Sequence, residues 1–452
     1  MILERIESEG VAHYSYIFGD GNRAAVIDPR RDCEIYIKKA SKKNLQITHI
    51  FETHRNEDYA IGSVELGKRT DSEIWHADEK LDYKYGNAVK DGQDWQFGRL
   101  SLKAIHTPGH TPGSMSYLLD DPDGNPWIIF TGDVLFAGDV GRVDLLGLDK
   151  MKELAGMLYE TIFTKILPLG DDIIVCPAHG AGSVCGADIA ERIWTTIGLE
   201  KKYNQKLKCK NKEDFVSKIA KKLDRPPYFK KMEKYNIEGT PILGSLPILR
   251  PLSATEFANI AKDAIIIDSR METCFGAAHI LNSISIWLEG IPAFAGWFLT
   301  YDKPILLIGE SKDIDRATRY LIRLGYDKLV GYLSGGILSW HTAGFESSSI
   351  KMMTVKKLCN NLDKNLDVMI LDVRSEEELA KTGKITNAKH IHLTQLLEKL
   401  DEIPKDQTIY IFCGSGLRSM TAASILKRNG WDDLVVVLGG IAGWNSMTCP
   451  IE

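Results

Sequence analysis

The stretch Thr53-His54-Arg55-Asn56-Glu57-Asp58-Tyr59 follows directly after an apolar run at residues 47–51. A short apolar run predicts a buried strand, and the polar residues behind it predict a turn at the end of that strand. Folds built of helices and strands commonly place their chemistry in such turns. This stretch therefore predicts a functional site within a layered α/β fold.

Four later segments repeat the pattern of an apolar run followed by a polar turn. They are His106-Thr-Pro-Gly-His110-Thr-Pro-Gly-Ser114, Phe130-Thr-Gly-Asp133, Gly138-Asp-Val-Gly-Arg142 and Cys176-Pro-Ala-His179-Gly180. Imidazole nitrogens and carboxylate oxygens are common metal ligands. We therefore expect the His and Asp side chains of these segments to converge on one metal ion.

The order and spacing of these residues resemble the metallo-β-lactamase superfamily. Its signature is His-x-His-x-Asp-His, followed by a lone His, an Asp after a strand and a final His. The resemblance covers roughly the first half of the chain and implies a four-layer αββα sandwich with the metal at one edge of its sheets. Asn56 and Tyr59 stand where the family has its second and third histidines.

The two missing histidines bear on which metal the site is expected to hold. A two-metal hydrolase uses several ligands on each ion, so the loss of one imidazole from each disfavours a pair of zinc ions. His54, His110 and Asp133 remain around the first ion. Two histidines and one carboxylate form the ligand set of non-haem Fe(II) oxygenases. This set leaves about three positions open on an octahedral ion.

Within the superfamily, this trio resembles that of the persulfide dioxygenases. The resemblance implies one Fe(II) per chain on His54, His110 and Asp133, and the oxidation of a thiol persulfide to sulfite with O2. Open positions on the ion are what O2 and a sulfur substrate need. The alternative is a decayed site that binds no metal.

Other residues of these segments are expected to support the trio. Those expected to hydrogen-bond to ligands or to water, and so to fix their orientation, are Asn56, Asp58, Tyr59 and His179. Tyr59 could donate such a bond near the open face of the metal. Cys185 lies six residues past His179, and it would either contact sulfur or serve as a small packed residue.

A lysine-rich stretch covers residues 200–234, and it is interpreted as a solvated helix face or as a rim that attracts an anionic thiol carrier. It contains Arg225-Pro-Pro-Tyr228-Phe229, which is similar to an element near the substrate entrance of bacterial persulfide dioxygenase fusions. Arg225 and Tyr228 are therefore candidate substrate contacts. Arg142 and Asp144 are expected to form a structural ion pair.

Length and composition describe an ordinary globular chain. Its 452 residues predict about three domains, and a net charge of −5 gives no reason to expect nucleic acid. No signal peptide or long apolar run is visible, so a cytoplasmic protein without a membrane partner is expected. A homo-oligomer is also expected. The eight cysteines contain no Cys-x-x-Cys pair, which argues against a zinc ribbon or a disulfide framework.

From about residue 250 the chain repeats itself. Ile265-Ile-Ile-Asp268-Ser-Arg270 matches Ile370-Leu-Asp372-Val-Arg374, and Gly335-Gly-Ile-Leu-Ser-Trp340 matches Gly439-Gly-Ile-Ala-Gly-Trp444. Asp268 and Asp372, like Gly335 and Gly439, are 104 residues apart. Two copies of a domain with a parallel α/β sheet are therefore predicted, and the expected domains are 1–245, 246–348 and 349–452.

The second copy contains Ile409-Tyr-Ile-Phe-Cys413-Gly-Ser-Gly-Leu-Arg418-Ser419, followed by a predicted helix at residues 420–428. A strand, a six-residue loop and a helix start form an anion cradle whose N–H groups and helix dipole lower the pKa of a thiol. This resembles a rhodanese, which implies a persulfide on Cys413 and a catalytic Arg418. The loop residues that would hold the persulfide are Gly414, Ser415, Gly416, Leu417 and Ser419.

Two details refine the rhodanese resemblance. The related cysteine phosphatases have loops one residue longer, so a six-residue loop favours sulfur over phosphate as the transferred group. In the first copy, Gly309 aligns with Cys413. That copy therefore has no nucleophile, and it is expected to be an inactive spacer or interface domain.

The whole chain is similar to persulfide dioxygenase–rhodanese fusions of bacterial sulfide detoxification. The resemblance implies low-molecular-weight thiol persulfide, O2, sulfite and thiosulfate as reaction partners. One alternative is a glyoxalase II-like thioester hydrolase, which would use zinc. The other is a non-oxidising sulfur carrier whose first domain only binds.

Overall fold

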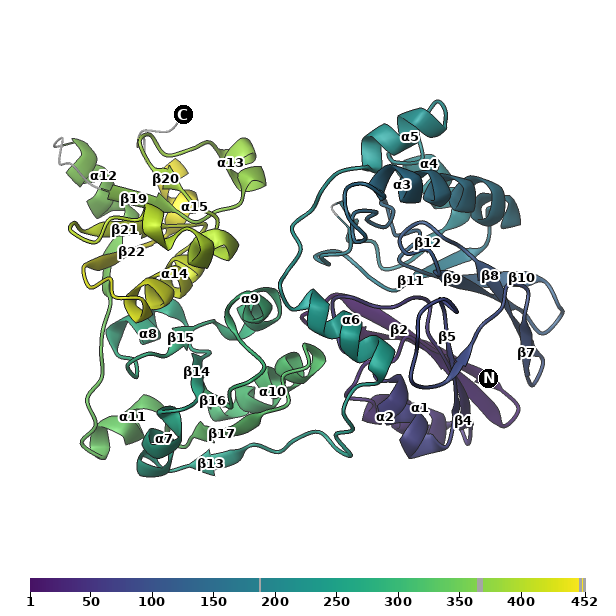
Figure 1. Ribbon diagram of the computed structural model, residues 1–452, viewed down its shortest axis with the longest axis horizontal. Coiled ribbons are helices and arrows are strands. Elements are labelled where there is room, and N and C mark those ends of the chain that lie inside the picture. The colour runs from purple at the N-terminus through teal and green to yellow at the C-terminus, as the bar shows by residue number, and fades with distance from the viewer. Residues whose placement is uncertain (187, 364–368, 447–448, 450–452) are drawn as a thin grey trace. The chain divides into compact units, whose positions relative to one another are not determined.

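A computed structural model describes residues 1–452 except 187, 364–368, 447–448 and 450–452 (Figure 1). The chain divides into two compact units. Unit 1 comprises Met1–Leu246 with Ile322–Gly325, and unit 2 comprises Pro247–Leu321 with Tyr326–Glu452. The expected domain boundaries after residues 245 and 348 remain predictions.

Unit 1 contains two six-stranded sheets. The first runs in the order β1 (Ile2–Ser8), β2 (His13–Asp20), β3 (Arg23–Ile27), β4 (Gln46–Phe51), β5 (Glu73–His76) and β6 (Asn87–Ala88). The second runs in the order β12 (Thr195–Thr196), β11 (Ile174–Pro177), β10 (Pro126–Gly132), β9 (Met115–Asp120), β8 (Leu100–His106) and β7 (Asp94–Phe97). The helices are α1 (Glu34–Lys42), α2 (Ser63–Thr70), α3 (Met151–Glu160), α4 (Ile197–Tyr203), α5 (Lys212–Ile219) and α6 (Phe229–Glu238).

The layers of unit 1 follow from the alternation of side chains along its strands. In β2, Tyr16 and Phe18 enter the core between the two sheets, whereas Ile17 packs with residues of α1 and α2. In β10, Phe130 enters the same central core, whereas Ile129 packs with residues of α3 and α5. Helices therefore cover the outer face of each sheet (Figure 1). The expected αββα sandwich is confirmed.

Three of the site residues directly follow the ends of strands. β3 pairs parallel with β4, and β10 pairs parallel with β11. His54 follows β4, Asp133 follows β10 and His179 follows β11, so all three lie beyond carboxyl ends of parallel strands, a common location for binding sites. Strands β7 to β10 follow one another as antiparallel neighbours.

Unit 2 contains two five-stranded sheets, in which the paired strands are parallel. One has the order β13 (Arg250–Leu252), β17 (Leu329–Leu333), β16 (Ile305–Ile308), β14 (Ile265–Asp268) and β15 (Ile284–Ser285). The other has the order β18 (Lys351–Thr354), β22 (Leu434–Leu438), β21 (Ile409–Phe412), β19 (Met369–Asp372) and β20 (Lys389–His390). The two orders are equivalent, which confirms the predicted parallel α/β fold of both copies.

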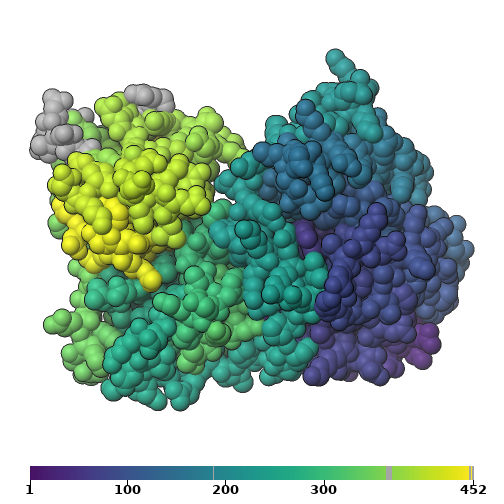
Figure 2. Space-filling view, in the orientation of Figure 1, coloured from purple at the N-terminus to yellow at the C-terminus, as the bar shows by residue number. Residues whose placement is uncertain are grey.

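Among the described residues, the first copy of unit 2 has five α-helices and the second copy has four. They are α7 (Ala254–Ala261), α8 (Glu272–Ala277), α9 (Ile291–Phe298), α10 (Ile314–Arg323), α11 (Gly336–Thr342), α12 (Val355–Asp363), α13 (Glu376–Thr382), α14 (Leu417–Arg428) and α15 (Gly440–Asn445). The two copies touch, since the Ser285 N–H donates to Ser424 Oγ at 3.1 Å and their green and yellow atoms adjoin in the space-filling view (Figure 2). α14 begins at Leu417, three residues earlier than expected, so the helix starts inside the predicted loop.

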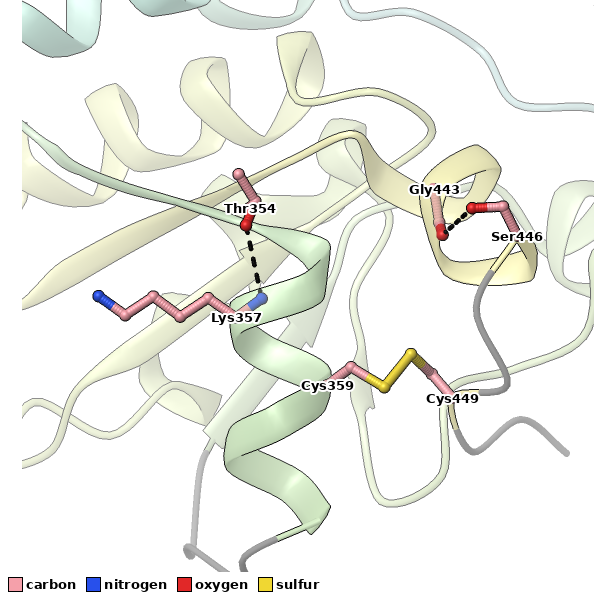
Figure 3. The surroundings of a disulfide bond; sticks show 6 residues. All are labelled: Thr354, Lys357, Cys359, Gly443, Ser446 and Cys449. Atoms are coloured by element: carbon pink, nitrogen blue, oxygen red, sulfur yellow. Dashed lines mark hydrogen bonds between the residues drawn. A yellow bond between two sulfur atoms is a disulfide. The ribbon is translucent and has the colours of Figure 1, made fainter.

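A disulfide joins Cys359 on α12 to Cys449 near the C-terminus (Figure 3). The two residues are 90 apart in the sequence, and no spacing motif connects them. The cysteine spacing argued against a disulfide framework, and it did not reveal this single pair, which the fold brings together. No helix of the described residues has the length and apolar character needed to cross a membrane.

The disulfide leads to a stability prediction. A cross-link between residues 90 apart restricts the unfolded chain, an effect typically worth about 2–4 kcal/mol. We expect Cys359→Ser to lower the free energy of unfolding of the last domain by that amount, measured by urea denaturation of the full chain without reductant. Cys209→Ser, which removes a partly exposed unpaired thiol, is the control. Eight titratable thiols in the unfolded, unreduced protein would contradict the pairing.

Candidate metal centre and thiol loop

The structure brings His54, His110 and Asp133 together in the interior of unit 1. The Nε2 atoms of His54 and His110 each lie 3.7 Å from Asp133 Oδ2. All three residues are buried, and one ligand atom from each lies within 4.8 Å of the others. This is the spatial arrangement that a shared metal ion requires.

The orientation of both imidazoles leaves Nε2 available. His110 Nδ1 lies 2.8 Å from the Arg142 carbonyl oxygen, which can only accept, so this nitrogen carries the proton. His54 Nδ1 lies 2.8 Å from Thr53 Oγ1, and the Thr53 hydroxyl donates to Asp28 Oδ2 at 2.7 Å. His54 Nδ1 therefore also donates, which leaves a lone pair on each Nε2.

The three residues fit a metal cation. His110 Nε2 and Asp133 Oδ2 are buried and have no hydrogen-bond partner among the described residues. Buried polar atoms without partners cost free energy, and a cation would satisfy both of them. The donor set, two imidazoles and one carboxylate, is one that iron and zinc accept.

Asp28 is a supporting residue that the sequence did not single out. It follows β3 directly, and its carboxylate accepts hydrogen bonds from the Thr53 N–H at 2.8 Å and from the Thr53 hydroxyl. Burial raises the pKa of Asp28 to about 7, although the Thr53 hydrogen bonds counteract this effect. The only signal in the sequence is an acid at the end of an apolar run.

Glu57 is a second acidic group that sequence reasoning missed. It is buried, and its Oε2 lies 3.5 Å from His110 Nε2, while Arg55 donates to its Oε1 at 3.1 Å. Burial alone would raise the pKa of Glu57, but the contacts with His110 and Arg55 lower it to about 2. Glu57 is therefore an ionised carboxylate beside the three candidate ligands.

The turn at residues 56–61 is held by one asparagine of α6. The Asn236 amide donates to the carbonyls of Asn56 and Tyr59 at 2.7 and 2.8 Å, and its oxygen accepts from the Ile61 N–H at 3.0 Å. Asn236 is buried within a helix, where a side chain that binds a distant backbone segment has a positioning role. Asn236 lies two residues beyond the lysine-rich stretch, and no sequence motif marks it.

Asn56 and Tyr59, which stand at the two missing histidine positions, contact neighbouring residues. Asn56 Nδ2 donates to the His54 carbonyl at 3.2 Å. The Tyr59 ring packs on His13 with ring centroids 4.0 Å apart, and its buried hydroxyl has no hydrogen-bond partner among the described residues. A hydrogen bond from the Tyr59 hydroxyl near the open face of the metal stays a prediction.

Asp58, His179 and Cys185 form a second group beside the first. His179 Nδ1 lies 2.7 Å from Asp133 Oδ1, and His179 Nε2 lies 2.9 Å from Asp58 Oδ2. Burial alone would lower the pKa of His179, but the carboxylates of Asp133 and Asp58 raise it well above its usual value. Cys185 is buried against this pair, and burial raises the pKa of its thiol.

The candidate substrate contacts Arg225 and Tyr228 bind parts of unit 1. The Tyr228 hydroxyl donates to the Asp58 carbonyl at 3.0 Å, and Arg225 pairs with Glu233. A role in substrate binding stays a prediction for both. The expected ion pair between Arg142 and Asp144 is confirmed, with nitrogen–oxygen distances of 2.8 and 2.9 Å.

Cys413 lies between β21 and α14, at the start of the thiol loop, residues 413–418. Its side chain is buried, and the Gly416 N–H donates to Sγ at 3.1 Å. The start of α14 and this N–H are the kind of donors that hold an anion. Gly439 N–H donates to the Ser415 carbonyl at 2.8 Å, and Ile441 N–H donates to the Cys413 carbonyl at 3.0 Å, so the repeated Gly-Gly segment supports the loop.

Arg418 is paired with a glutamate. Its guanidinium donates to both oxygens of Glu378, at 2.6 and 2.5 Å. Burial alone would raise the pKa of Glu378, but Arg418 lowers it to about 2. A negative charge on Glu378 thus offsets the positive charge at the end of the thiol loop.

At the matching position of the first copy, a side chain would displace a serine hydroxyl. A Cβ atom on Gly309 would lie 2.4 Å from Ser269 Oγ. Gly336 of the first copy matches Gly440 of the second. A Cβ atom on Gly440 would lie 2.4 Å from the Cys413 carbonyl oxygen, so Gly440 packs closely on the thiol loop, whereas a Cβ atom on Gly336 would meet open space. The absence of persulfide chemistry in this copy stays a prediction.

Comparison with known proteins assigns these parts of the chain to families. Residues 9–179 match the metallo-beta-lactamase superfamily, and residues 253–343 and 354–447 each match the rhodanese-like domain. A crystal structure of a metallo-beta-lactamase from Staphylococcus aureus subsp. aureus COL is 32% identical, with a TM-score of 0.65, and the match covers 74% of this chain and 98% of that one.

Two curated relatives match unit 1. Hydroxyacylglutathione hydrolase GloC of Haemophilus influenzae is 30% identical over 224 residues, which are 44% of this chain and 93% of the relative. The mitochondrial persulfide dioxygenase ETHE1 of Bos taurus is 28% identical over 235 residues, which are 47% of this chain and 78% of the relative. The chain therefore belongs to the metallo-beta-lactamase superfamily, and its superfamily domain is followed by two rhodanese-like domains.

Proposed function

We propose that this chain is an iron-dependent persulfide dioxygenase that also transfers sulfur through its last rhodanese domain. In the first reaction, a low-molecular-weight thiol persulfide, O2 and water give the free thiol, sulfite and two protons. The observation that carries this proposal is the trio of His54, His110 and Asp133, with Asn56 and Tyr59 in place of two further imidazoles. Similarity to a persulfide dioxygenase supports it.

Iron held by this trio would supply positions for O2 and for the persulfide sulfur. The residues of the chain prepare that site. Asp28 and Thr53 keep the proton of His54 on Nδ1, and the Arg142 carbonyl does the same for His110. Asn236 and Tyr228 hold the backbone of the turn that follows His54. Glu57 adds a fixed negative charge beside His110.

The second reaction takes place on Cys413. Its thiolate attacks the outer sulfur of thiosulfate, the sulfur–sulfur bond breaks, and sulfite leaves as a persulfide forms on Cys413. In reverse, sulfite takes the outer sulfur of that persulfide and leaves as thiosulfate. The Gly416 N–H and the start of α14 would stabilise the negative charge on sulfur. Sulfite from the first reaction could thus be converted to thiosulfate by the same chain.

Similarity to a hydroxyacylglutathione hydrolase supports a second candidate, the hydrolysis of a glutathione thioester. Both candidates use the same fold, but the hydrolase needs a second metal, which Asn56 and Tyr59 do not favour. Thioester hydrolysis by the zinc-loaded protein, together with no O2 uptake by the iron-loaded protein, would favour this second candidate.

His54→Ala tests the oxidative reaction. Removal of one of three ligands should abolish both iron binding and O2 uptake, measured by metal analysis and with an oxygen electrode in the presence of glutathione persulfide. His106→Ala is the control, because His106 lies in the same segment as His110 but its imidazole Nε2 lies 2.9 Å from the Pro112 carbonyl oxygen and not beside the trio. Iron-loaded wild-type protein that consumes no O2 with any thiol persulfide would refute the proposal.

Thr53→Val tests the contact that orients His54. Loss of the hydroxyl removes the acceptor for His54 Nδ1–H, and such losses reduce metal affinity or activity by about 10–100-fold. We expect a decrease of this size in iron affinity, measured by competition with a chelator. Thr53→Ser, which keeps the hydroxyl, should restore affinity to near the wild-type value. Equal affinities of the Val and Ser variants would exclude this role for Thr53.

Cys413→Ser tests the division between the two reactions. The variant should lose transfer of sulfur from thiosulfate to cyanide but retain O2 uptake with glutathione persulfide. Cys274→Ser is the matched control, because Cys274 is an exposed cysteine of the first copy and its loss should change neither activity. Sulfur transfer at the wild-type rate by Cys413→Ser would show that another group is the nucleophile.

A further inference from the structure

An ion pair borders the thiol loop. The Arg418 guanidinium donates to both carboxylate oxygens of Glu378, at 2.6 and 2.5 Å. The pair lies against Gly414, the residue after Cys413. A Cβ atom on Gly414 would lie 3.1 Å from Arg418 Nη2 and 3.8 Å from Glu378 Oε1. The edge of the guanidinium that would bind a sulfonate with two hydrogen bonds is therefore occupied by a carboxylate of the same domain.

Glu378 is held in this position by the start of its own helix. It is the third residue of α13, and it forms a capping box with Ser375. Glu378 Oε2 accepts the Ser375 N–H at 3.0 Å, and the Glu378 N–H donates to Ser375 Oγ at 3.2 Å. A capping box satisfies two backbone donors reciprocally. The carboxylate is therefore directed at the thiol loop by α13 as well as by Arg418.

The first copy lacks both members of the pair. At the repeat distance of 104 residues, Cys274 stands in place of Glu378. Ile314 stands in place of Arg418. The first copy nevertheless has the equivalent strand order, so this type of domain folds without the ion pair. Because the pair occurs in the copy that has a cysteine in its loop, we associate it with the chemistry of that loop.

The charges at the thiol loop do not favour a dianion. Residues 414–417 are uncharged. Burial alone would raise the pKa of Glu378, but Arg418 lowers it to about 2, so the carboxylate is ionised at neutral pH and the pair has no net charge. Thiosulfate carries two negative charges and must displace Glu378 to reach both guanidinium nitrogens. A thiol persulfide with a protonated outer sulfur brings no charge to the reacting atom and avoids this repulsion.

We propose that Glu378 determines the donor preference of Cys413, disfavouring thiosulfate and favouring a thiol persulfide. This inference rests on the proposed sulfur transfer through Cys413 and names its donor class. In the loading step, the Cys413 thiolate attacks the outer sulfur of R–S–S–H and the sulfur–sulfur bond breaks. The thiolate R–S⁻ leaves, and the proton remains on the new persulfide of Cys413.

The rate at which each donor loads Cys413 tests this role, measured with the full chain under nitrogen so that no O2 is consumed. Mass spectrometry of the intact protein follows persulfide formation from thiosulfate or from glutathione persulfide, and Cys413→Ser gives the background from other cysteines. We expect Glu378→Gln to raise the rate constant for thiosulfate by about 10-fold, because the hydrogen bonds that compete for Arg418 lose their charge. The rate constant for glutathione persulfide should be unchanged.

Two features keep the comparison specific. Glutamine at the third helical position also completes a capping box, so Glu378→Gln retains the start of α13. Glu377→Gln is the matched control, because Glu377 is the exposed neighbour in the same helical turn. It removes the same charge and should change neither rate constant.

An unchanged ratio of the two rate constants in Glu378→Gln would overturn this inference alone. Faster loading of the wild-type chain by thiosulfate than by glutathione persulfide would also overturn it. Loss of loading by both donors in Glu378→Gln would show that Glu378 supports the loop and does not select the donor. A wild-type chain in which neither donor loads Cys413 would refute the proposed sulfur transfer itself.

Discussion

The Asp133 carboxylate is the group on which the first site depends, because its two oxygens face different partners. Oδ2 lies 3.7 Å from Nε2 of His54 and of His110, and Oδ1 lies 2.7 Å from His179 Nδ1. A buried carboxylate requires such partners, since its removal from water is costly. Burial alone would raise the pKa of Asp133, but the three imidazoles hold it well below its usual range. The ionised side chain joins both ligand groups into one network.

The close approach of the two sheets permits this network. Gly132 precedes Asp133 with φ of 54°, and a Cβ atom there would lie 2.5 Å from Thr53 Oγ1. Any other residue would push away the threonine that orients His54. A glycine is needed because only it combines this backbone conformation with so short a contact. The end of β10 in one sheet can thus meet the end of β4 in the other.

The two rhodanese-like copies share a fold but differ in the loop that carries the cysteine. Both keep the same strand order and a buried arginine–aspartate pair, Arg270 with Asp268 and Arg374 with Asp372, each with a nitrogen–oxygen distance of 2.6 Å. Only the second copy has a cysteine in this loop, Cys413, and a glycine, Gly440, packed against the loop. Stability depends on the core of each sheet, whereas sulfur transfer depends on a few loop atoms, so the two properties can separate.

The sequence by itself determined the fold class, the repeat, and the residues that lie together at the first site. Apolar runs and polar turns can be recognised from residues that are neighbours in the sequence, and His54, His110 and Asp133 lie in such turns. Tertiary structure alone decided that Asp28 and Glu57 lie beside them, that Tyr59 packs on His13, and that Cys359 meets Cys449. These contacts join residues whose separation in the chain carries no pattern. They arise only when packed layers bring distant strand ends and loops within a few ångströms of each other.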